Sequence, residues 1–285
     1  MPDHNKKEEI HYFSSEELKK LQMLGLEMLI EVDRICRKHG INYQLDGGVL
    51  LGAARDGRFI PWDDAVDIRM LRKDYNRFCK VCETELDKER FFLQNYFTDP
   101  GYRWEYAKLL RNGTGFYRIN QEMLTQRKNI YLDIFPCDNM PEKGLNKLLF
   151  NVECFWYRKI AYSPIGAVHE KNLLKKCVYR VLRHIPKEYF VNGFEALSQR
   201  ISDGRTKLVR ILGWGGDLEW KGYLYNWLKY SQDMSFEGRM FLVPVDYDGY
   251  LRYHIGNDYM KLPPKEKQIG DNFVTSVESG DAIRT

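Results

Sequence analysis

The sequence has no apolar run long enough to cross a membrane, and its first residues are polar and charged, unlike a secretion signal. Its six cysteines are scattered. The one close pair, Cys79 and Cys82, has no second pair to complete a zinc site. We therefore expect reduced cysteines without a disulfide framework, and a cytoplasmic protein.

The chain also lacks a large excess of either charge and any internal repeat. Its 44 basic and 40 acidic residues leave a net charge of +4, which does not indicate nucleic-acid binding. With 285 residues, 44% of them hydrophobic, it can bury one large core with an appended lobe. Aromatic residues make up 14%, which is typical of proteins with large contact surfaces for sugars, bases or membranes.

Two adjacent motifs carry the most information. Residues 46–55 read DGGVLLGAAR, a glycine pair followed by an apolar run and an arginine. Residues 59–68 read FIPWDDAVDI, a turn that leads acidic residues into an apolar strand. Glycines let phosphate oxygens approach the backbone, and carboxylates hold a divalent cation beside them. The two motifs together therefore predict a phosphate-and-metal site, with a helix N-terminus facing the phosphate.

Hydrophobic periodicity and capping signals place the main elements around these motifs. A long amphipathic helix begins after Ser14, continues to about Lys38 and ends at Gly40. Shorter elements follow on the same criteria. They are helices opening at 49–54 and spanning 73–87, and strands at 41–45, 65–70, 91–96, 103–110 and 130–135, the last stopped by Pro136.

Asp133 is embedded in the apolar strand 130–135. An acid in such a place is costly unless it is paired or bound to a metal, so Asp133 is a functional candidate on physical grounds alone.

Residues 141–190 differ from the rest in composition. Ten Lys and Arg stand against four Glu and are interleaved with aromatic residues, in two expected helices at roughly 144–160 and 170–184. A basic, aromatic helix pair can lie against an anionic membrane surface. A solvated helical insertion with its aromatics in the core explains the pattern equally well.

The combined pattern resembles the LicD family of phosphotransferases. The resemblance rests on the two motifs above, on Arg-Lys-Asp-Tyr at 72–75 and on Tyr-Leu-Asp-Ile-Phe-Pro at 131–136, and it spans about residues 18–265. It is specific because further family-like segments occur near 241–264. It divides the chain into a catalytic core at 14–140, a helical insertion at 141–200 and a C-terminal part of the domain at 201–268, with flexible ends at 1–13 and 269–285.

The resemblance implies an α+β, nucleotidyltransferase-like fold, a mixed β-sheet flanked by helices with a helical insertion. It also implies transfer of phosphocholine from CDP-choline to a hydroxyl of a cell-surface glycan precursor, of the teichoic acid or lipopolysaccharide type, with Mg²⁺ (or Mn²⁺) and release of CMP. Fukutin and fukutin-related protein, which transfer ribitol phosphate, are distant relatives. Another CDP-alcohol donor (ribitol, glycerol or ethanolamine), a nucleotidyl transfer and a non-catalytic nucleotide-binding protein remain alternatives.

In such a site two acids alternate on one strand and a third comes from a neighbouring strand. The resemblance implies catalytic and metal-binding roles for Asp67 and Asp133, with Asp63 as an accessory acid, but Ala65 stands where the family usually has Asp. Loss of one metal carboxylate predicts an impaired enzyme. Because the surrounding motif is intact, we favour a substitution introduced into an active enzyme over a naturally inactive relative.

Further substrate contacts are expected from residues near these acids. The glycine pair Gly47 and Gly48 is predicted to cradle phosphate, and Arg55, Lys108 and Arg111 to contact phosphate or the diphosphate. His254 is expected to be structural. The expected partners are a CDP-alcohol and a lipid-linked or polymeric glycan, with membrane contact through 141–190 and no nucleic acid.

Overall fold

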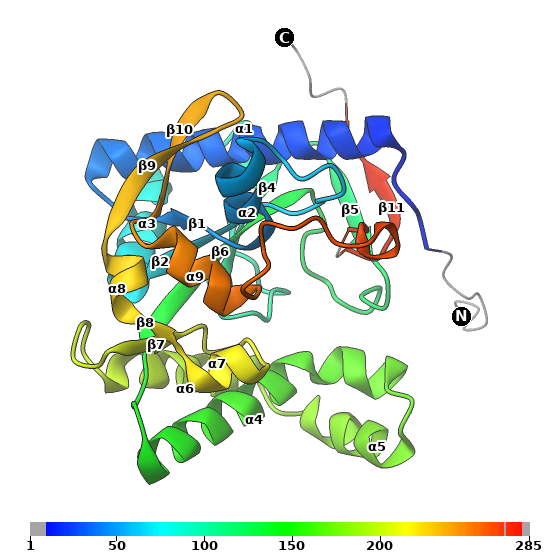
Figure 1. Cartoon of the computed structure of the whole chain (residues 1–285). Helices are drawn as coiled ribbons and strands as arrows, with labels where there is room; N and C mark the ends of the chain where they lie inside the picture. Colours follow the sequence, from blue (N-terminus) through cyan, green and yellow to red (C-terminus); the bar gives the residue numbers. More distant parts are fainter. Residues whose placement is uncertain (1–9, 271, 281–285) are drawn as a thin grey trace.

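A computed structural model describes residues 10–270 and 272–280. Its main sheet is mixed: β2 and β6 run parallel and the other described pairs antiparallel (Figure 1). This confirms the predicted α+β class with helices flanking a mixed sheet. In order, the strands are β1 (Gln44–Leu45), β2 (Asp67–Leu71), β6 (Tyr131–Asn139), β4 (Ala107–Arg111) and β3 (Phe91–Gln94), and β7 (Leu208–Arg210) and β8 (Tyr223–Leu224) extend from β6.

The long helix α1 (Ser15–His39) lies along the sheet and confirms the sequence prediction. Ser14 and Glu17 form a reciprocal capping box, and Gly40 ends the helix in the left-handed conformation. The helix contacts β4, β6 and α3 (Arg72–Glu85) through the main hydrophobic core.

A close approach fixes α1 against the segment that enters β2. A β-carbon at Gly25 would lie 2.5 Å from Cγ2 of Val66, so only glycine leaves room for this valine. Because successive side chains of an extended chain alternate, Val66 faces α1 and Asp67 faces the other side of the sheet. The face with Asp67 is where the functional candidates gather.

Strand β6 continues through Pro136 to Asn139, although the sequence predicts that this proline ends it. The amide of Asp133 donates to the carbonyl of Val66 on the β2 side. By alternation, the nitrogen of Pro136 faces the opposite side, where pairing with β4 has already ended at Ala107. A proline is tolerated there because no partner strand needs its N–H.

Residues 144–200 form a helical lobe of α4 (Gly144–His169), α5 (Leu173–Leu182) and α6 (Lys187–Arg200), which lies below the sheet domain in Figure 1. Helix α4 is longer than the predicted 144–160 because it passes through Pro164. The proline leaves the carbonyl of Ile160 without its helical donor, and the hydroxyl of Ser163 and the guanidinium of Arg103 donate to it instead. Arg103 thereby ties the lobe to the loop before β4.

The C-terminal part returns to the sheet domain, where the hairpin of β9 (Ser231–Phe236) and β10 (Arg239–Pro244) packs against β1 and α2 (Gly47–Asp56). The sequence predicts a flexible end from 269, but Val274–Glu278 forms β11 and pairs with β5 (Gly115–Arg118). No helix among the described residues has the length and apolar character to cross a membrane. The remaining elements are α7 (Asp217–Lys221), α8 (Tyr225–Lys229), α9 (Tyr247–His254), the 3-10 turn η1 (Lys265–Lys267) and β11 (Val274–Glu278).

The contact between Gly25 and Val66 predicts a specific mutational coupling. Gly25→Ala should lower the free energy of unfolding by about 1–3 kcal/mol, because the new methyl group overpacks against the valine. Val66→Ala should remove most of that penalty in the double variant. Urea unfolding of the single and double variants measures this, with the partly exposed Met23→Ala on the same helix as control. Additive effects would contradict the contact.

Candidate active site

Three charged side chains form a row across adjacent strands of the sheet. Asp67 on β2 pairs with Asp133 on β6, and Asp133 pairs with Lys108 on β4. The Lys108 Nζ and Asp133 Oδ1 atoms lie 2.7 Å apart. Residues directly opposite in a ladder point to the same face, so the three side chains share one surface. The two predicted acids and the predicted lysine are therefore brought together.

This row holds more negative than positive charge in a largely buried place. Burial, and then the charge of Asp133, raises the pKa of Asp67 well above its ordinary value. Burial also lowers the pKa of Lys108 to about 8, although the neighbouring Asp133 opposes this shift. Two neighbouring carboxylates repel each other when both are ionised, and a cation bound between them would relieve this repulsion.

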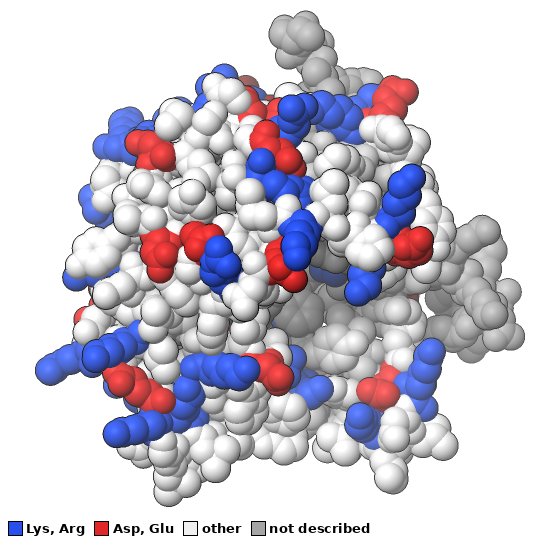
Figure 2. All heavy atoms as spheres, viewed as in Figure 1, with Lys and Arg blue, Asp and Glu red and all other residues white. Residues whose placement is uncertain are grey.

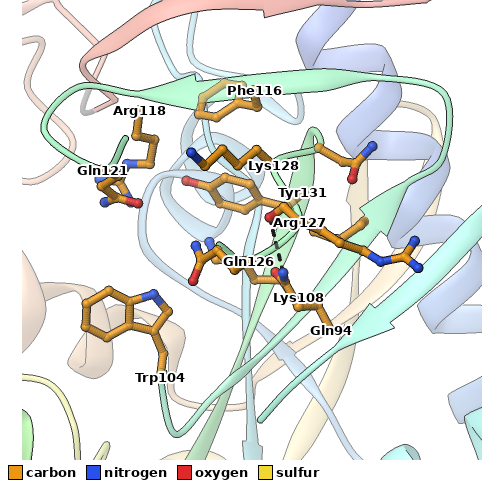
Figure 3. Close-up of a pocket in the computed structure, with 12 residues that line it drawn as sticks. Gln94, Trp104, Lys108, Phe116, Arg118, Gln121, Gln126, Arg127, Lys128 and Tyr131 are labelled. Carbon is orange, nitrogen blue, oxygen red and sulfur yellow. Dashed lines mark hydrogen bonds between the residues drawn. The ribbon is translucent and has the colours of Figure 1, made fainter. Parts of the chain in front are cut away.

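The lysine is held from its other side by an aromatic ring. Its Nζ lies 3.1 Å from the ring centroid of Tyr131, and Figure 3 shows the two side chains together. A cation over the face of a ring is stabilised by the ring's quadrupole. Tyr131 therefore positions the lysine beside Asp133.

The glycine pair at the start of α2 lies against carboxylates. Gly47 has a φ of 54°, and a β-carbon there would be 3.6 Å from Oδ2 of Asp67. A β-carbon at Gly48 would be 2.3 Å from Oδ2 of Asp63. The glycines thus bring two predicted acids to the helix N-terminus, where backbone N–H groups favour negative charge. Their phosphate-cradling role stays a prediction.

Asp46, directly before this helix, belongs to a buried polar network. The Arg69 guanidinium and the Tyr250 hydroxyl both donate to its carboxylate. Burial alone would raise the pKa of Asp46, but the charges of Arg69 and His254 and the hydrogen bonds from Tyr250 and Arg69 together outweigh it and leave this pKa below its ordinary value. His254 stacks on Tyr250, and its Nδ1 lies 2.9 Å from the Tyr223 hydroxyl, in keeping with the expected structural role.

The acidic turn before β2 is covered by the C-terminal segment. The backbone and side-chain amides of Asn272 donate to the carboxylate of Asp64 at 3.1 and 3.0 Å. Ala65 follows in the segment that leads into β2, which begins at Asp67 rather than at the predicted residue 65. Residue 65, where the family usually has Asp, therefore lies just outside the paired strand.

Two predicted phosphate contacts lie away from the row. Arg55 occupies the last turn of α2, the end opposite the glycines, and its Nε donates to Asp56 at 2.9 Å. Arg111 is three residues beyond Lys108 on β4, and its Nε donates to Glu27 of α1 at 2.9 Å. Neither side chain is brought together with Asp67 and Asp133.

A pocket beside the row is lined by cations and amides. Figure 3 shows Trp104 and Gln121 at one side of it, with Tyr131 between Lys108 and Lys128. None of the described residues that line it is acidic. Its cationic residues are Lys108, Arg118, Arg127 and Lys128. The pocket's volume of about 20 Å³ holds little more than a water molecule, so these cations can meet a diphosphate only where the pocket opens.

A second cavity, of about 440 Å³, lies between the sheet domain and the helical lobe. It shares Trp104, Arg118 and Gln121 with the first pocket, so the two form one cleft. This volume falls in the range of small-molecule sites. The cavity is rich in rings: Trp104, Tyr106, Tyr162, Tyr179 and Trp214 line it.

The acids alone supply too few ligands for a metal ion, so a substrate would have to supply the others. The described residues contain no group of three or more His, Cys, Asp or Glu that could hold an ion by themselves. Mg²⁺ commonly binds through one or two carboxylates plus substrate phosphates. Asp67 and Asp133, next to a cationic pocket, would be the protein's share of such a site, and this metal-binding role stays a prediction.

Sequence reasoning missed Arg69, Arg118 and Tyr131 as parts of the site. A signal existed for Arg69, because a charge inside an apolar strand must be paired, by the same argument that singled out Asp133. Arg118 and Tyr131 gave no such signal, because only the tertiary structure brings them beside Lys108: Tyr131 comes from the neighbouring strand β6, and Arg118 from β5 in a separate two-stranded sheet.

A mixed sheet with acids on adjacent strands, next to a glycine-started helix and a cationic cleft, defines a nucleotidyltransferase-like domain. The family described as "LicD/FKTN/FKRP, nucleotidyltransferase domain" matches residues 40–169. This match covers a little under half of the chain and, with the relatives below, makes the chain similar to the LicD family.

Two kinds of relative share this similarity. The chain is 27% identical to the lipopolysaccharide cholinephosphotransferase LicD of Haemophilus influenzae over 260 residues, 88% of this chain and 94% of the relative. It is 31% identical to the mouse and human ribitol 5-phosphate transferase FKRP over 97 residues, 34% of this chain and 17% of those relatives. Both kinds of relative are transferases, and the similarity supports a transferase family.

The Asp46 network predicts unequal costs for its members. Asp46→Asn should lower the free energy of unfolding by about 3–5 kcal/mol, because the buried charge of Arg69 loses its counter-ion. Tyr250→Phe should lower it by only about 1–2 kcal/mol, since it removes one hydrogen bond. Urea unfolding at neutral pH measures both, and equal costs would contradict the assigned ion pair.

The same ion pair sets the direction of a pH effect. A carboxyl whose folded-state pKa is lowered contributes stability that is present above its unfolded pKa and is lost as the pH falls through the folded value. The stability difference between the present chain and Asp46→Asn should therefore shrink as the pH falls below about 4. Unfolding free energies measured down the acid range test this.

Proposed function

We propose that this chain is built to transfer phosphocholine from CDP-choline to a hydroxyl of a cell-surface glycan precursor, with Mg²⁺ and release of CMP. The row of Lys108, Asp133 and Asp67 beside a cationic cleft is the observation that carries the proposal. Similarity to a cholinephosphotransferase along 88% of the chain supports the choice of donor.

The cleft suggests how the donor is held. Arg118 lines both the small pocket and the larger cavity, which has room for the diphosphate, and Lys108 lies in the small pocket beside it; their charges favour phosphate oxygens. The rings of Trp104, Tyr106 and Trp214 offer faces for cytosine or for the trimethylammonium group. Because Arg158 and Lys159 line the same cavity, we favour cytosine there.

The acids supply the metal site and the base. Asp67 and Asp133, with Asp63 nearby, would hold Mg²⁺ or Mn²⁺, which neutralises the diphosphate and the departing CMP. Asp133 takes the proton of the acceptor hydroxyl. The hydroxyl oxygen bonds to the phosphorus that carries choline, the bond from this phosphorus to the CMP oxygen breaks, and CMP leaves with its electron pair.

Ala65 weakens this chemistry in the present chain. A carboxylate at this position would add a third acid close to Asp67, and Ala65 borders a small void also lined by Asp64 and Tyr131. With alanine there, the protein contributes fewer metal ligands. The absence of a complete acidic cluster among the described residues also favours a second candidate, a relative that binds nucleotide without transfer.

The alcohol carried by the donor separates the remaining candidates. The similarity to ribitol 5-phosphate transferases favours CDP-ribitol as the alternative donor, and CDP-glycerol and CDP-ethanolamine are further candidates. Nucleotidyl transfer would require a free triphosphate instead.

Calorimetric titration of CDP-choline, CDP-ribitol, CDP-glycerol, CDP-ethanolamine and CTP, with and without Mg²⁺, tests the proposal. We expect selective CDP-choline binding, and Ala65→Asp should strengthen the Mg²⁺-dependent part about tenfold, the effect of one added ligand. The exposed Ala196→Asp on α6 is the matched control and should change nothing. Absence of CDP-alcohol binding in every variant would overturn the donor assignment.

Transfer to a hydroxyl acceptor gives a second readout for the same variants. Ala65→Asp should restore or raise release of CMP from CDP-choline, and Asp133→Asn in that background should abolish it. If Ala65→Asp binds the donor but releases no CMP, the nucleotide-binding alternative is the better description.

The position of each cation predicts its role in donor binding. Arg118→Ala should raise the Kd for CDP-choline about tenfold to a hundredfold, because it removes a charge-assisted phosphate contact. Arg111→Ala should leave this Kd unchanged and lower stability instead, since its guanidinium binds Glu27. Calorimetry and thermal unfolding of the two variants separate the roles, and the opposite pattern would place the diphosphate elsewhere.

A further inference from the structure

Helix α5 turns an apolar stripe toward solvent. The side chains of Leu173, Leu174 and Val181 are 78%, 81% and 71% exposed, and Val178 is 49% exposed. At about 100° per residue these positions and Cys177 fall within one arc about 140° wide. A helix of a soluble domain ordinarily buries such a stripe, so this one lacks its partner.

The opposite side of α5 is already occupied. Tyr179 is buried and packs so closely on Gly166 of α4 that a β-carbon there would lie 2.4 Å from the ring. Its hydroxyl accepts from Nζ of Lys159 at 3.0 Å. The helix therefore cannot turn its apolar stripe inward without losing these contacts.

Cations border the stripe on both sides. On a helical projection Lys175 lies beyond one edge, while Lys176 and Arg180 lie beyond the other, and Arg183 follows at the C-terminus. Helix α5 itself contains no acidic residue. In Figure 2 the lower right corner, where Figure 1 places α5, combines uncharged surface with Lys and Arg atoms and some acidic atoms between them.

We propose that α5 lies flat on an anionic lipid surface, with its apolar stripe in the headgroup region and its cations against lipid phosphates. An outward apolar stripe with basic borders is the signature of helices that lie in a membrane interface. A second copy of the chain is a poorer occupant, because a two-fold interface would bring the same basic borders face to face.

The cleft lies directly behind this surface. Tyr179, on the inner side of α5, also lines the cavity between the lobe and the sheet domain. Docking through α5 would hold this cavity close to the lipid surface. An acceptor carried on a lipid would then reach it from the bilayer, an inference that rests on the proposed function.

Co-sedimentation with lipid vesicles tests the docking surface. One set of vesicles is pure phosphatidylcholine, and the other contains about a third of the anionic lipid phosphatidylglycerol. Each set is used at low salt and at about 1 M salt. We expect the full chain to bind the anionic vesicles at low salt only. Leu174→Glu with Val181→Glu, and Lys175→Glu with Arg180→Glu, should each reduce binding at least about tenfold.

Matched controls keep the result interpretable. Leu262→Glu with Met240→Glu alters similarly exposed apolar side chains elsewhere and should leave binding unchanged. All variants should keep the thermal midpoint of the unaltered chain, because the altered side chains are exposed. Absence of binding to anionic vesicles, or equal binding by the α5 variants, overturns the proposal.

Two further measurements separate lipid docking from dimer formation and from the proposed binding of the donor. A dimer in light scattering that the α5 variants dissociate, without vesicle binding, would assign the stripe to a second copy. CDP-choline titration without vesicles reports on the proposed function alone. Intact donor binding without vesicle binding therefore overturns only the docking surface, and the reverse result overturns only the donor assignment.

Discussion

The parallel pairing of β2 with β6 is the constraint on which the rest of the structure depends. Its register sets Asp67 directly against Asp133, which concentrates negative charge on a sheet face that is largely buried. The cost of that arrangement is visible in the raised pKa of Asp67. The surrounding elements reduce it: β4 supplies Lys108, and α2 directs its N-terminus at the acids through two glycines that leave room for them.

The C-terminal third of the chain holds this arrangement in place from outside the sheet. Helix α9 brings Tyr250 to Asp46, whose carboxylate also binds Arg69 on β2. The segment before β11 covers Asp64. These contacts fix both flanks of the acidic strand, which explains why family-like segments occur so far along the chain from the first two motifs. The main hydrophobic core correspondingly includes residues from α1 to β11.

The helical lobe has a separate small core and meets the sheet domain across the cleft. Its attachment includes Arg103, whose guanidinium donates to the carbonyls of Ile160 and Ala161 in the turn before Pro164. A lobe joined in this way can form one wall of a binding site while leaving α5 at the surface. The same helix therefore contributes Tyr179 to the cleft and an apolar stripe to the outside, which connects the proposed donor site with the proposed lipid surface.

Much of this protein could be read from local sequence. The capping of α1, the glycine turn into α2 and the need of Asp133 for a partner depend on neighbouring residues and on the cost of burying a charge, both of which act locally. Strand ends were less predictable: β6 passes through Pro136 only because β4 ends opposite it, and residues 274–278 form a strand only because β5 offers an edge. The tertiary structure alone decided that Lys108 joins the acids while Arg55 and Arg111 bind elsewhere. Charge and residue type are properties of the sequence, but which charges meet depends on strand order and register, which long-range pairing determines.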